Sequence, residues 1–246
     1  MSAVISITSG KGGTGKTSLA GGIASCLAAL GHRVLCIDMD VGLRNLDLTL
    51  GMSDRTLMDF TDVLSGRTTL EKAAVPHPVI QGLFLLTAPL TAPRDLITEE
   101  SLKQLLRQAR ESFAYILLDA PAGLGGGFRM SVCGADRALV ISTTDASALR
   151  DAQRTVGELS RCVSNIHLVI NRLQPKLMRQ LHTTIDDAMD TAGLPLLGVV
   201  PEDPQVMLAA NRGKPLILTA RWGAARAYLN IARRLTGERV PLMYLR

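Results

Sequence analysis

Short runs of consecutive apolar residues recur along the chain and alternate with longer segments whose apolar residues return every three or four positions. The short runs are typical of strands buried on both faces, and the longer segments are typical of helices that bury one face. Their order predicts an α/β fold: a doubly wound, mainly parallel sheet with right-handed crossovers and helices on both faces. The predicted strands are residues 3–7, 33–38, 83–86, 115–119, 137–141, 166–170 and 196–200, and the predicted helices are residues 19–30, 56–64, 98–109, 147–162, 176–192 and 222–235.

The composition fits one domain over residues 1–246, because 47% of the residues are hydrophobic and no linker interrupts the pattern. No basic and apolar leader precedes the first predicted strand, and no apolar run is long enough to cross a bilayer, so we expect a cytoplasmic protein. The net charge of +5 is spread along the chain and suits an anionic membrane or nucleic acid without selecting either. The cysteines show no metal or redox spacing and are expected as reduced core residues: Cys26, Cys36, Cys133 and Cys162.

A glycine-rich turn joins the first predicted strand to the first predicted helix. It has the spacing of a phosphate-binding P-loop, in the strand–turn–helix context that such a loop requires. Glycines let several backbone N–H groups point at one anion, and the helix N-terminus adds its own unpaired N–H groups. We predict that Lys16 contacts the β- and γ-phosphates and that the Thr17 hydroxyl binds Mg²⁺. The predicted nucleotide-binding residues of this loop are Gly10, Lys11, Gly12, Gly13, Thr14, Gly15, Lys16, Thr17 and Ser18.

Lys11 is a second lysine at the front of this loop. Because Lys16 already serves the triphosphate in its own subunit, Lys11 is predicted to contact the phosphate of a second subunit. It would then stabilise charge in trans, as an arginine finger does, and act with Lys16 as a catalytic group. In that case nucleotide binding and homodimerisation are one event. The alternative is that Lys11 is a solvated surface charge.

Three aspartates stand at or just after the ends of apolar strands, where open α/β sheets build ligand sites. Asp119 matches a Walker B acid and is predicted to bind Mg²⁺ through water, while Asp38 is predicted to support the metal. Asp40 is predicted to position the attacking water as a catalytic group. A helix cap or turn role for Asp40, and a structural role for Asp119, stay open. Residues 120–123, together with Gly125, Gly126 and Gly127, are expected to form a second, mobile switch loop that senses the γ-phosphate.

The form Lys11-Gly-Gly-x-Gly-Lys-Thr17 resembles the deviant P-loop of the ParA/MinD family of ATPases. The resemblance runs from about residue 3 to residue 241, and its other specific parts are the runs from Asp38 to Asp47 and from Asp119 to Gly123. The run Gly42–Asp47 points to the division-site branch of that family. The resemblance implies a homodimer that forms with ATP and Mg²⁺ on the inner face of the cell membrane. It also implies a MinC-like division inhibitor and a MinE-like or other activator as partners, with the helix around Ser147–Arg154 offered to them.

The adenine base is expected at two further strand ends. Asn171 follows the predicted strand 166–170, and its side chain offers both a donor and an acceptor, which suits a purine edge. An asparagine at a strand end can also be a plain turn residue. The resemblance implies base contacts from the Asn171–Arg172 pair and from the turn made by Pro201, Glu202 and Asp203.

Other functions stay open at this stage. A ParA-like ATPase would use DNA as its surface for partitioning or for positioning cargo or a flagellum, and a nucleotide-binding scaffold would have negligible turnover. An iron-protein-like electron carrier would need paired cysteines, and none lies in residues 119–128. The short apolar tail 237–246 is expected either to bind membrane weakly, doubled by dimerisation, or to pack on the domain together with Trp222, Tyr228 and Leu229.

Overall fold

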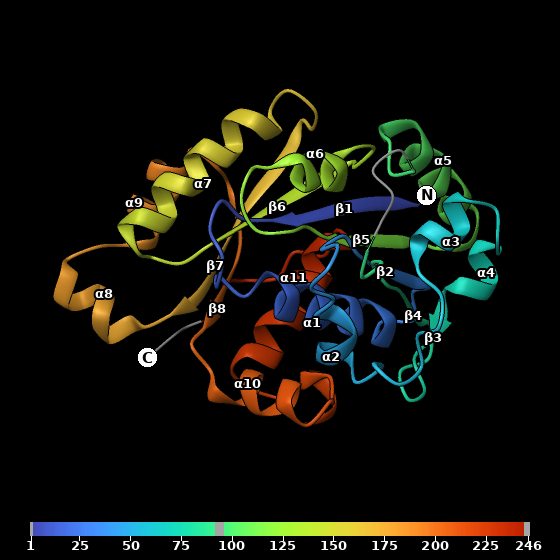
Figure 1. The fold of residues 1–246 in the computed structure, drawn as a ribbon. Coiled ribbons are helices and arrows are strands. Elements are labelled where there is room, and N and C mark those ends of the chain that lie inside the picture. Colours follow the sequence, from blue (N-terminus) through green and yellow to red (C-terminus); the bar gives the residue numbers. More distant parts are fainter. Residues whose placement is uncertain (1, 92–95, 244–246) are drawn as a thin grey trace.

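A central sheet of eight strands carries helices on both faces (Figure 1). The computed structural model describes residues 2–91 and 96–243, and within these the strand order is β3-β4-β2-β5-β1-β6-β7-β8. All ladders are parallel except the antiparallel pair β3–β4, so the predicted doubly wound, mainly parallel sheet is confirmed. The strands are β1 (Ala3–Thr8), β2 (Val34–Asp38), β3 (Val75–Pro76), β4 (Leu83–Leu86), β5 (Tyr115–Asp119), β6 (Arg137–Ser142), β7 (Asn165–Leu173) and β8 (Leu196–Pro201).

The helices divide between the two faces because successive strand residues point to opposite sides. Ile5 and Ile7 of β1 join a core with α1 and α11, whereas Val4 joins the core beneath α5. A third core lies beneath α6, α7 and α9. The helices are α1 (Lys16–Ala29), α2 (Leu46–Leu50), α3 (Phe60–Leu64), α4 (Leu70–Ala73), α5 (Glu99–Ser112), α6 (Gly126–Val132), α7 (Ala146–Leu159), α8 (Pro175–Leu181), α9 (Ile185–Ala192), α10 (Pro204–Asn211), the 3-10 turn η1 (Leu216–Leu218) and α11 (Ala224–Leu235).

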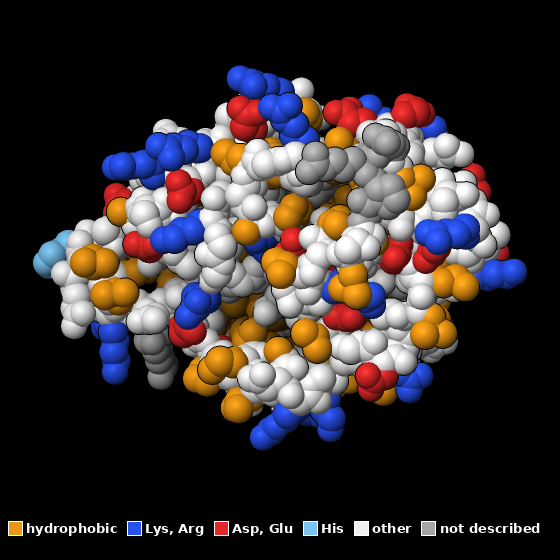
Figure 2. Space-filling view, in the orientation of Figure 1, with side chains coloured by type: hydrophobic (Ala, Val, Ile, Leu, Met, Phe, Trp, Pro, Cys, Tyr) orange, Lys and Arg blue, Asp and Glu red, His pale blue; other side chains and the backbone are white. Residues whose placement is uncertain are grey.

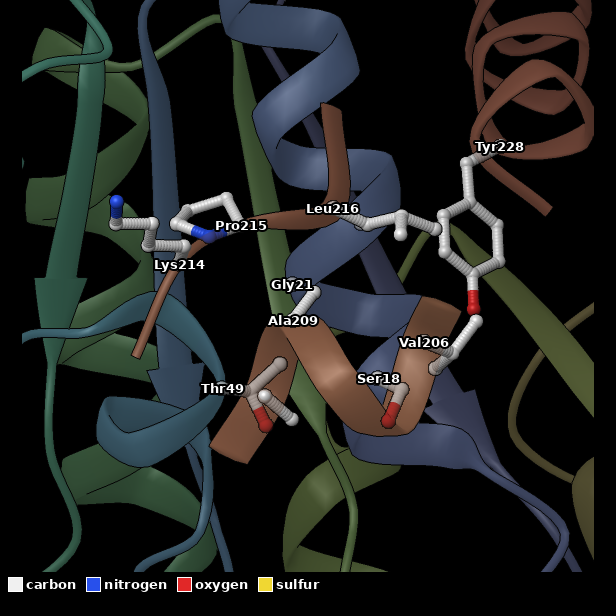
Figure 3. A pocket seen from close by; sticks show the side chains of 11 residues that line it. Ser18, Gly21, Thr49, Val206, Ala209, Lys214, Pro215, Leu216 and Tyr228 are labelled. Carbon is white, nitrogen blue, oxygen red and sulfur yellow. The ribbon is translucent and has the colours of Figure 1, made fainter. Parts of the chain in front are cut away.

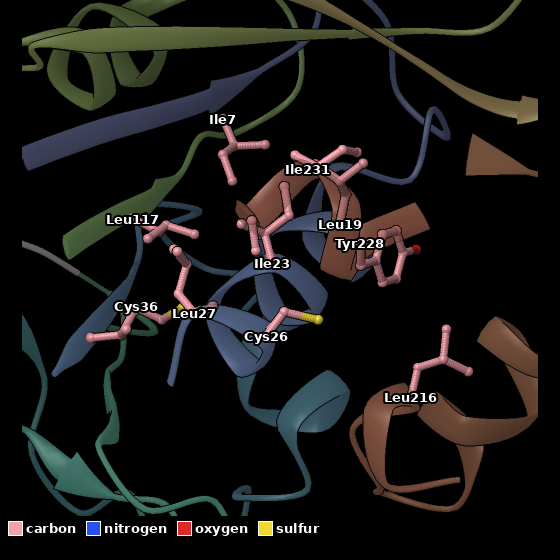
Figure 4. Packing of buried hydrophobic residues seen from close by; sticks show 14 of the residues in the cluster. Ile7, Leu19, Ile23, Cys26, Leu27, Cys36, Leu117, Leu216, Tyr228 and Ile231 are labelled. Carbon is pink, nitrogen blue, oxygen red and sulfur yellow. The ribbon is translucent and has the colours of Figure 1, made fainter. Parts of the chain in front are cut away.

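The packing of α1 against α11 depends on the absence of a side chain at Gly22. A Cβ atom there would overlap the ring of Tyr228, which is buried against α1. Ile23 of α1 and Ile231 of α11 lie close to this contact in the same core (Figure 4). The P-loop helix α1 is thereby fixed on the sheet beside α11, which itself contacts β8.

Two predicted helices differ from the structure for local reasons. The expected helix 176–192 is two helices, because His182 adopts a left-handed conformation with φ of 52° and Thr184 caps a new helix, α9. The expected helix 56–64 begins only at Phe60, since Asp59 is extended and its side chain caps α3. In contrast, the helix expected over 98–109 is present as α5, and the Thr98 side chain caps it by accepting the N–H of Ser101.

The predicted mobile switch loop after Asp119 was wrong in part. Gly126 and Gly127 are the first residues of α6, and Gly127 packs against Pro121, where a Cβ would come within 2.8 Å of the ring. Only the residues up to Gly125 form a loop. The expectation that every cysteine lies in the core was also wrong, because Cys162 is exposed beyond the end of α7.

The residues after α11 fold back on the domain. Arg234 donates from Nε to the carbonyl of Val240 at 3.0 Å and from Nη2 to that of Pro241 at 2.8 Å, and Met243 packs on the core. The end of the predicted tail, residues 244–246, lies outside the described residues. The expectation that Trp222 packs on the domain was wrong, since 79% of its surface is exposed, whereas Tyr228 is buried. Within residues 2–91 and 96–243, no helix combines the length and the apolar character needed to cross a membrane.

Candidate nucleotide-binding site

The carboxyl ends of β1, β2 and β5 meet at one edge of the sheet and bring the predicted phosphate and metal residues together. Asp38 and Asp119 are register partners on adjacent strands, and Ile7, just before the P-loop, is the partner of Asp119 on the other side. This adjacency follows from parallel pairing, since equivalent strand ends then lie side by side.

Several positions of the P-loop require glycine, because of their backbone conformation or because a side chain there would overlap a neighbouring segment. Gly13 and Gly15 have φ of 79° and 87°, in the left-handed region. A Cβ on Gly15 would overlap the side-chain amide of Asn171, and one on Gly10 would overlap the backbone of Asp151. The loop is therefore held between α7 and the end of β7, and it opens directly into α1 at Lys16.

Lys16 is buried at the floor of the loop. Burial lowers the pKa of its ammonium group, and the carboxylates of Asp119 and Asp40 oppose that shift. Buried Lys16 and Asp119 and half-buried Asp40 thus lie close enough to interact, and an anion bound together with a cation would balance their charges.

Asp119 is buried, and its Oδ1 has no hydrogen-bond partner among the described residues. Burial, together with the charge of nearby Asp38, raises the pKa of this carboxyl to about 7, although a hydrogen bond with Thr17 and the charge of Lys16 act against the shift. A buried carboxylate oxygen without a hydrogen-bond partner is stabilised when a cation binds to it. The donor set of Asp119 and the Thr17 hydroxyl therefore fits Mg²⁺, a hard cation that prefers oxygen ligands.

Asp38 is engaged in shaping the loop that follows β2. Its Oδ1 accepts the backbone N–H of Asp40 at 2.9 Å, and its Oδ2 accepts that of Leu46, the first residue of α2, at 3.1 Å. Burial raises the pKa of Asp38 even though both hydrogen bonds act against the shift. Asp40 is thereby positioned near Lys16. Burial raises the pKa of Asp40, and the charge of Lys16 opposes that change.

Lys11 lies on the rim of the site rather than inside it. Its Nζ is 3.3 Å from Oδ2 of Asp145 and 2.9 Å from Oγ of Ser147, at the start of α7. The Lys11 side chain is 47% exposed. Sequence reasoning did not predict this contact, because nothing in the spacing of Lys11 and Asp145 shows that α7 begins beside the P-loop.

The predicted base-contact residues line one cavity of about 420 Å³. Asn171 donates from Nδ2 to the carbonyl of Thr14 at 2.7 Å, and Arg172 donates to the carbonyl of Gly13 at 3.3 Å and to Glu202 at 2.8 Å. These residues tie β7 to the P-loop as well as lining the cavity. Pro201, at the end of β8, lies in the same wall.

Asp203 has a structural role that the sequence did not reveal. Its Oδ1 accepts the N–H of Gln205 at the start of α10, and its Oδ2 accepts the N–H of Ala224 at the start of α11. One carboxylate thus joins the N-termini of two helices, and both of its oxygens are engaged.

Helix α10 supplies the wall of the base cavity that sequence reasoning missed. Val206 and Met207 line the cavity, and Val206 also lines a smaller pocket of about 20 Å³ beside it. Figure 3 shows that smaller pocket between α1, α10 and the segment of Leu216, with Ser18 and Tyr228 on its border. The only signal for α10 was Pro204 after Asp203, a frequent start of a helix.

A phosphate loop backed by buried carboxylates at a strand edge, with a base cavity beside it, is the arrangement of P-loop nucleoside triphosphatases. The family model described as the CobQ/CobB/MinD/ParA nucleotide binding domain matches residues 5–216. Among curated proteins, the septum site-determining protein MinD of Bacillus subtilis is 39% identical over 100% of this chain and 93% of its own length. The MinD of a Synechocystis species is 38% identical over 99% of this chain and 92% of its own length.

Solved structures agree with these relatives. In the MinC:MinD cell division protein complex of Aquifex aeolicus, a chain with 38% identity matches with a TM-score of 0.92 over 99% of both chains. The Pyrococcus horikoshii MinD complexed with Mg-ADP matches with a TM-score of 0.84 at 28% identity, over 96% of each chain. The chain belongs to the MinD/ParA nucleotide-binding family, among its septum site-determining MinD proteins. It is a MinD-type ATPase of division-site positioning that uses ATP and Mg²⁺.

Proposed function

We propose that the chain is an ATP-driven homodimerising switch that recruits a MinC-like division inhibitor while it holds ATP. The observation that carries this proposal is the position of Lys11. It lies at the open edge of the P-loop and is half exposed, whereas Lys16 is buried beneath the loop. A lysine there can reach the phosphates of a second copy that faces the same edge.

In this proposal each residue of the site has one task. The P-loop amides and Lys16 hold the phosphates, Thr17 and Asp119 would hold Mg²⁺, and Asp38 keeps Asp40 in place. Mg²⁺, when bound, would neutralise phosphate charge during transfer. Asp40 would accept a hydrogen bond from the attacking water and orient it. Asn171, Arg172 and the turn 201–203 would border the base.

The contact of Lys11 with Asp145 and Ser147 suggests how dimerisation is transmitted to a partner. When Lys11 turns to the phosphate of the second copy, it leaves Asp145 and Ser147 at the start of α7. Those two side chains, and the exposed outer face of α7 with Arg150 and Arg154, then become available to a partner. We propose that the MinC-like inhibitor, and a MinE-like or other activator that resets the switch, use this face at the inner side of the membrane.

The test is the oligomeric state with each nucleotide. Light scattering after gel filtration should give a dimer for the wild type with ATP and Mg²⁺, and a monomer with ADP. Lys11→Ala should stay monomeric with ATP and keep its affinity for ADP, because Lys16 still serves the nucleotide in cis. Lys72→Ala, an exposed lysine on α4, serves as a control and should behave as the wild type. ATP-dependent dimers of Lys11→Ala would contradict the role in trans.

A further inference from the structure

Arg44 lies in the loop 39–45, which joins β2 to α2 and carries Asp40. Its backbone has φ of 45°, in the left-handed region that residues with a side chain adopt rarely. A long residue keeps such a conformation only where other contacts hold it there. The side chain of Arg44 supplies those contacts.

The guanidinium group of Arg44 binds two groups outside this loop. Its Nη2 donates to Oγ1 of Thr56 at 2.6 Å and to Oδ2 of Asp47, on α2, at 3.4 Å. The side chains of Arg44 and Asp47 are only 19% and 8% exposed, and Thr56 is buried. Because water competes little in such surroundings, these charge-assisted hydrogen bonds join the loop firmly to α2 and to the segment that carries Thr56.

The backbone of Arg44 extends this restraint to Asp40. The carbonyl of Asp40 accepts the N–H of Arg44 at 3.3 Å and that of Leu43 at 3.2 Å. On the other side, the N–H of Asp40 donates to Oδ1 of Asp38 at 2.9 Å. The peptide groups before and after the Asp40 side chain are therefore both held, one by Asp38 and the other by the turn that ends at Arg44.

The neighbouring side chains of the loop do not anchor it in the core. Val41 and Leu43 are 42% and 68% exposed, and Figure 2 shows exposed hydrophobic side chains near the centre of the view, in the region of α2. Gly42 has no side chain, although its N–H donates to the carbonyl of Pro89 at 3.1 Å. Within residues 41–45 the other four residues are exposed, so Arg44 is the one whose side chain fixes the loop.

We propose that Arg44 is a positioning residue for ATP hydrolysis: through Thr56 and Asp47 it fixes the loop in the shape that keeps Asp40 near Lys16. This inference rests on the proposed task of Asp40, which is to orient the attacking water. A catalytic group displaced by about 1 Å can cost about 10²-fold in rate. The phosphates and the base would be held by other elements, the P-loop and the ends of β7 and β8. Loss of the Arg44 side chain should therefore lower kcat and leave nucleotide affinity unchanged.

Arg44→Gly is the sharpest variant, because glycine adopts a positive φ without strain and only the guanidinium contacts are lost. Its kcat should fall roughly 10- to 100-fold, with the KM for ATP and the Kd for ADP unchanged. Arg44→Lys keeps a positive charge beside Asp47 but lacks the guanidinium fork, so it should restore part of the rate. The matched control is Arg55→Ala, which removes an exposed arginine next to Thr56 and should turn over as the wild type.

Two measurements separate positioning from a loss of stability. Guanidinium chloride, too dilute to unfold the protein, should raise the kcat of Arg44→Gly but not that of Asp40→Ala, with potassium chloride as the control for ionic strength. Arg44→Gly should also cost no further rate in an Asp40→Ala background, because a residue that acts through Asp40 has no effect once that carboxylate is gone. Light scattering with ATP and Mg²⁺ should show dimers of Arg44→Gly at the protein concentration of the assay.

Three outcomes would overturn the role of Arg44 and leave the proposed function standing. The first is wild-type turnover of Arg44→Gly while Asp40→Ala is slow. The second is an additive loss of rate in the double variant, which would mean that Arg44 acts independently of Asp40. The third is loss of the ATP-dependent dimer in Arg44→Gly. Wild-type turnover of both single variants would instead remove Asp40 from the proposed function, and the role of Arg44 with it.

Discussion

The ammonium group of Lys11 lies 3.3 Å from Oδ2 of Asp145, and the same carboxylate accepts the hydroxyl of Ser147 at 3.0 Å. The hydrogen bond from Ser147 and the charge of Lys11 both hold the pKa of Asp145 below its usual value. The lysine that the proposed dimer needs is therefore kept within its own subunit. Both side chains are about half exposed, so water screens the pair and the contact is weak and easily exchanged.

Weakening the contact between Lys11 and Asp145 should favour the ATP-dependent dimer slightly. Asp145→Asn removes the charge that holds Lys11, and an exposed ion pair contributes at most about 1 kcal/mol, so the ATP-dependent dimer should tighten by no more than about fivefold. Sedimentation equilibrium with ATP and Mg²⁺ measures the change. Glu158→Gln, on the same helix and paired only with Arg161 among described residues, should leave the dimer constant unchanged. A weaker dimer in Asp145→Asn would show that Asp145 itself contacts the second copy.

Replacing Asp40 should separate hydrolysis from binding. Asp40→Ala keeps the P-loop and the buried carboxylates but removes the group proposed to orient water, so turnover should fall about 10²- to 10⁴-fold. The dissociation constant for ADP should change little. Steady-state phosphate release and calorimetric titration with ADP measure the two quantities. Equal turnover in the variant and the wild type would remove Asp40 from the mechanism.

Asp38→Ala should instead lower the stability of the protein, because Asp38 holds the loop that follows β2. It leaves the N–H groups of Asp40 and Leu46 without their acceptor, and each lost hydrogen bond to a charged group contributes roughly 1.5–3 kcal/mol. Since two such bonds are lost, the free energy of unfolding of the nucleotide-free protein should fall by roughly 3–6 kcal/mol, as measured in urea. Asp40→Ala is the comparison and should unfold near the wild-type midpoint.

The pKa of Asp119, raised to about 7 by burial, predicts a pH dependence with a definite sign. Below about pH 4 this carboxyl is protonated in both states, and between about pH 4 and 7 only the folded state holds the proton. Stability due to Asp119 is therefore lost progressively as the pH rises from about 4 through 7. Without Mg²⁺ and nucleotide, the wild type should lose on the order of 2–3 kcal/mol relative to Asp119→Asn between about pH 5 and 8.

Urea unfolding of both proteins across that range measures this difference. Because Mg²⁺ requires the ionised carboxylate, binding of Mg²⁺ with ADP should strengthen as the pH rises toward about 7 in the wild type. Calorimetry in buffers of different ionisation enthalpy should detect the released proton. A constant difference between the two proteins over the whole range would contradict the raised pKa.

Adding a side chain at Gly22 should destabilise the domain. In Gly22→Ala the new methyl group overlaps the Tyr228 ring, and overpacking of this kind costs typically about 1–3 kcal/mol. Gly157→Ala is the matched control, because Gly157 lies inside α7 and no atom stands within 4 Å of the position that its Cβ would take. That substitution should stabilise the protein by about 0.5–1 kcal/mol. Thermal unfolding of both variants measures the contrast, and a melting temperature of Gly22→Ala at the wild-type value would contradict this account of the packing.

The sequence by itself determined the strand–helix alternation, the P-loop and the acids at the strand ends. Each of these is a local pattern: strands 3–8 and 115–119 are mostly apolar, and Gly10 to Thr17 has the spacing of a phosphate-binding loop. Parallel pairing then brings Asp38 and Asp119 together, because the polarity of a parallel sheet places all such ends at one edge.

Only the tertiary structure decided the features that depend on distant segments. The break at His182, the start of α6 at Gly126 and the left-handed Gly223 before α11 are set by caps and packing that override the local helical pattern. The contact of Lys11 with Asp145 spans 134 positions, and the hydrogen bond from the N–H of Ala224 to Asp203 ties the start of α11 to the residue that caps α10. These contacts join segments that lie far apart in the sequence, so they exist only after the chain has folded.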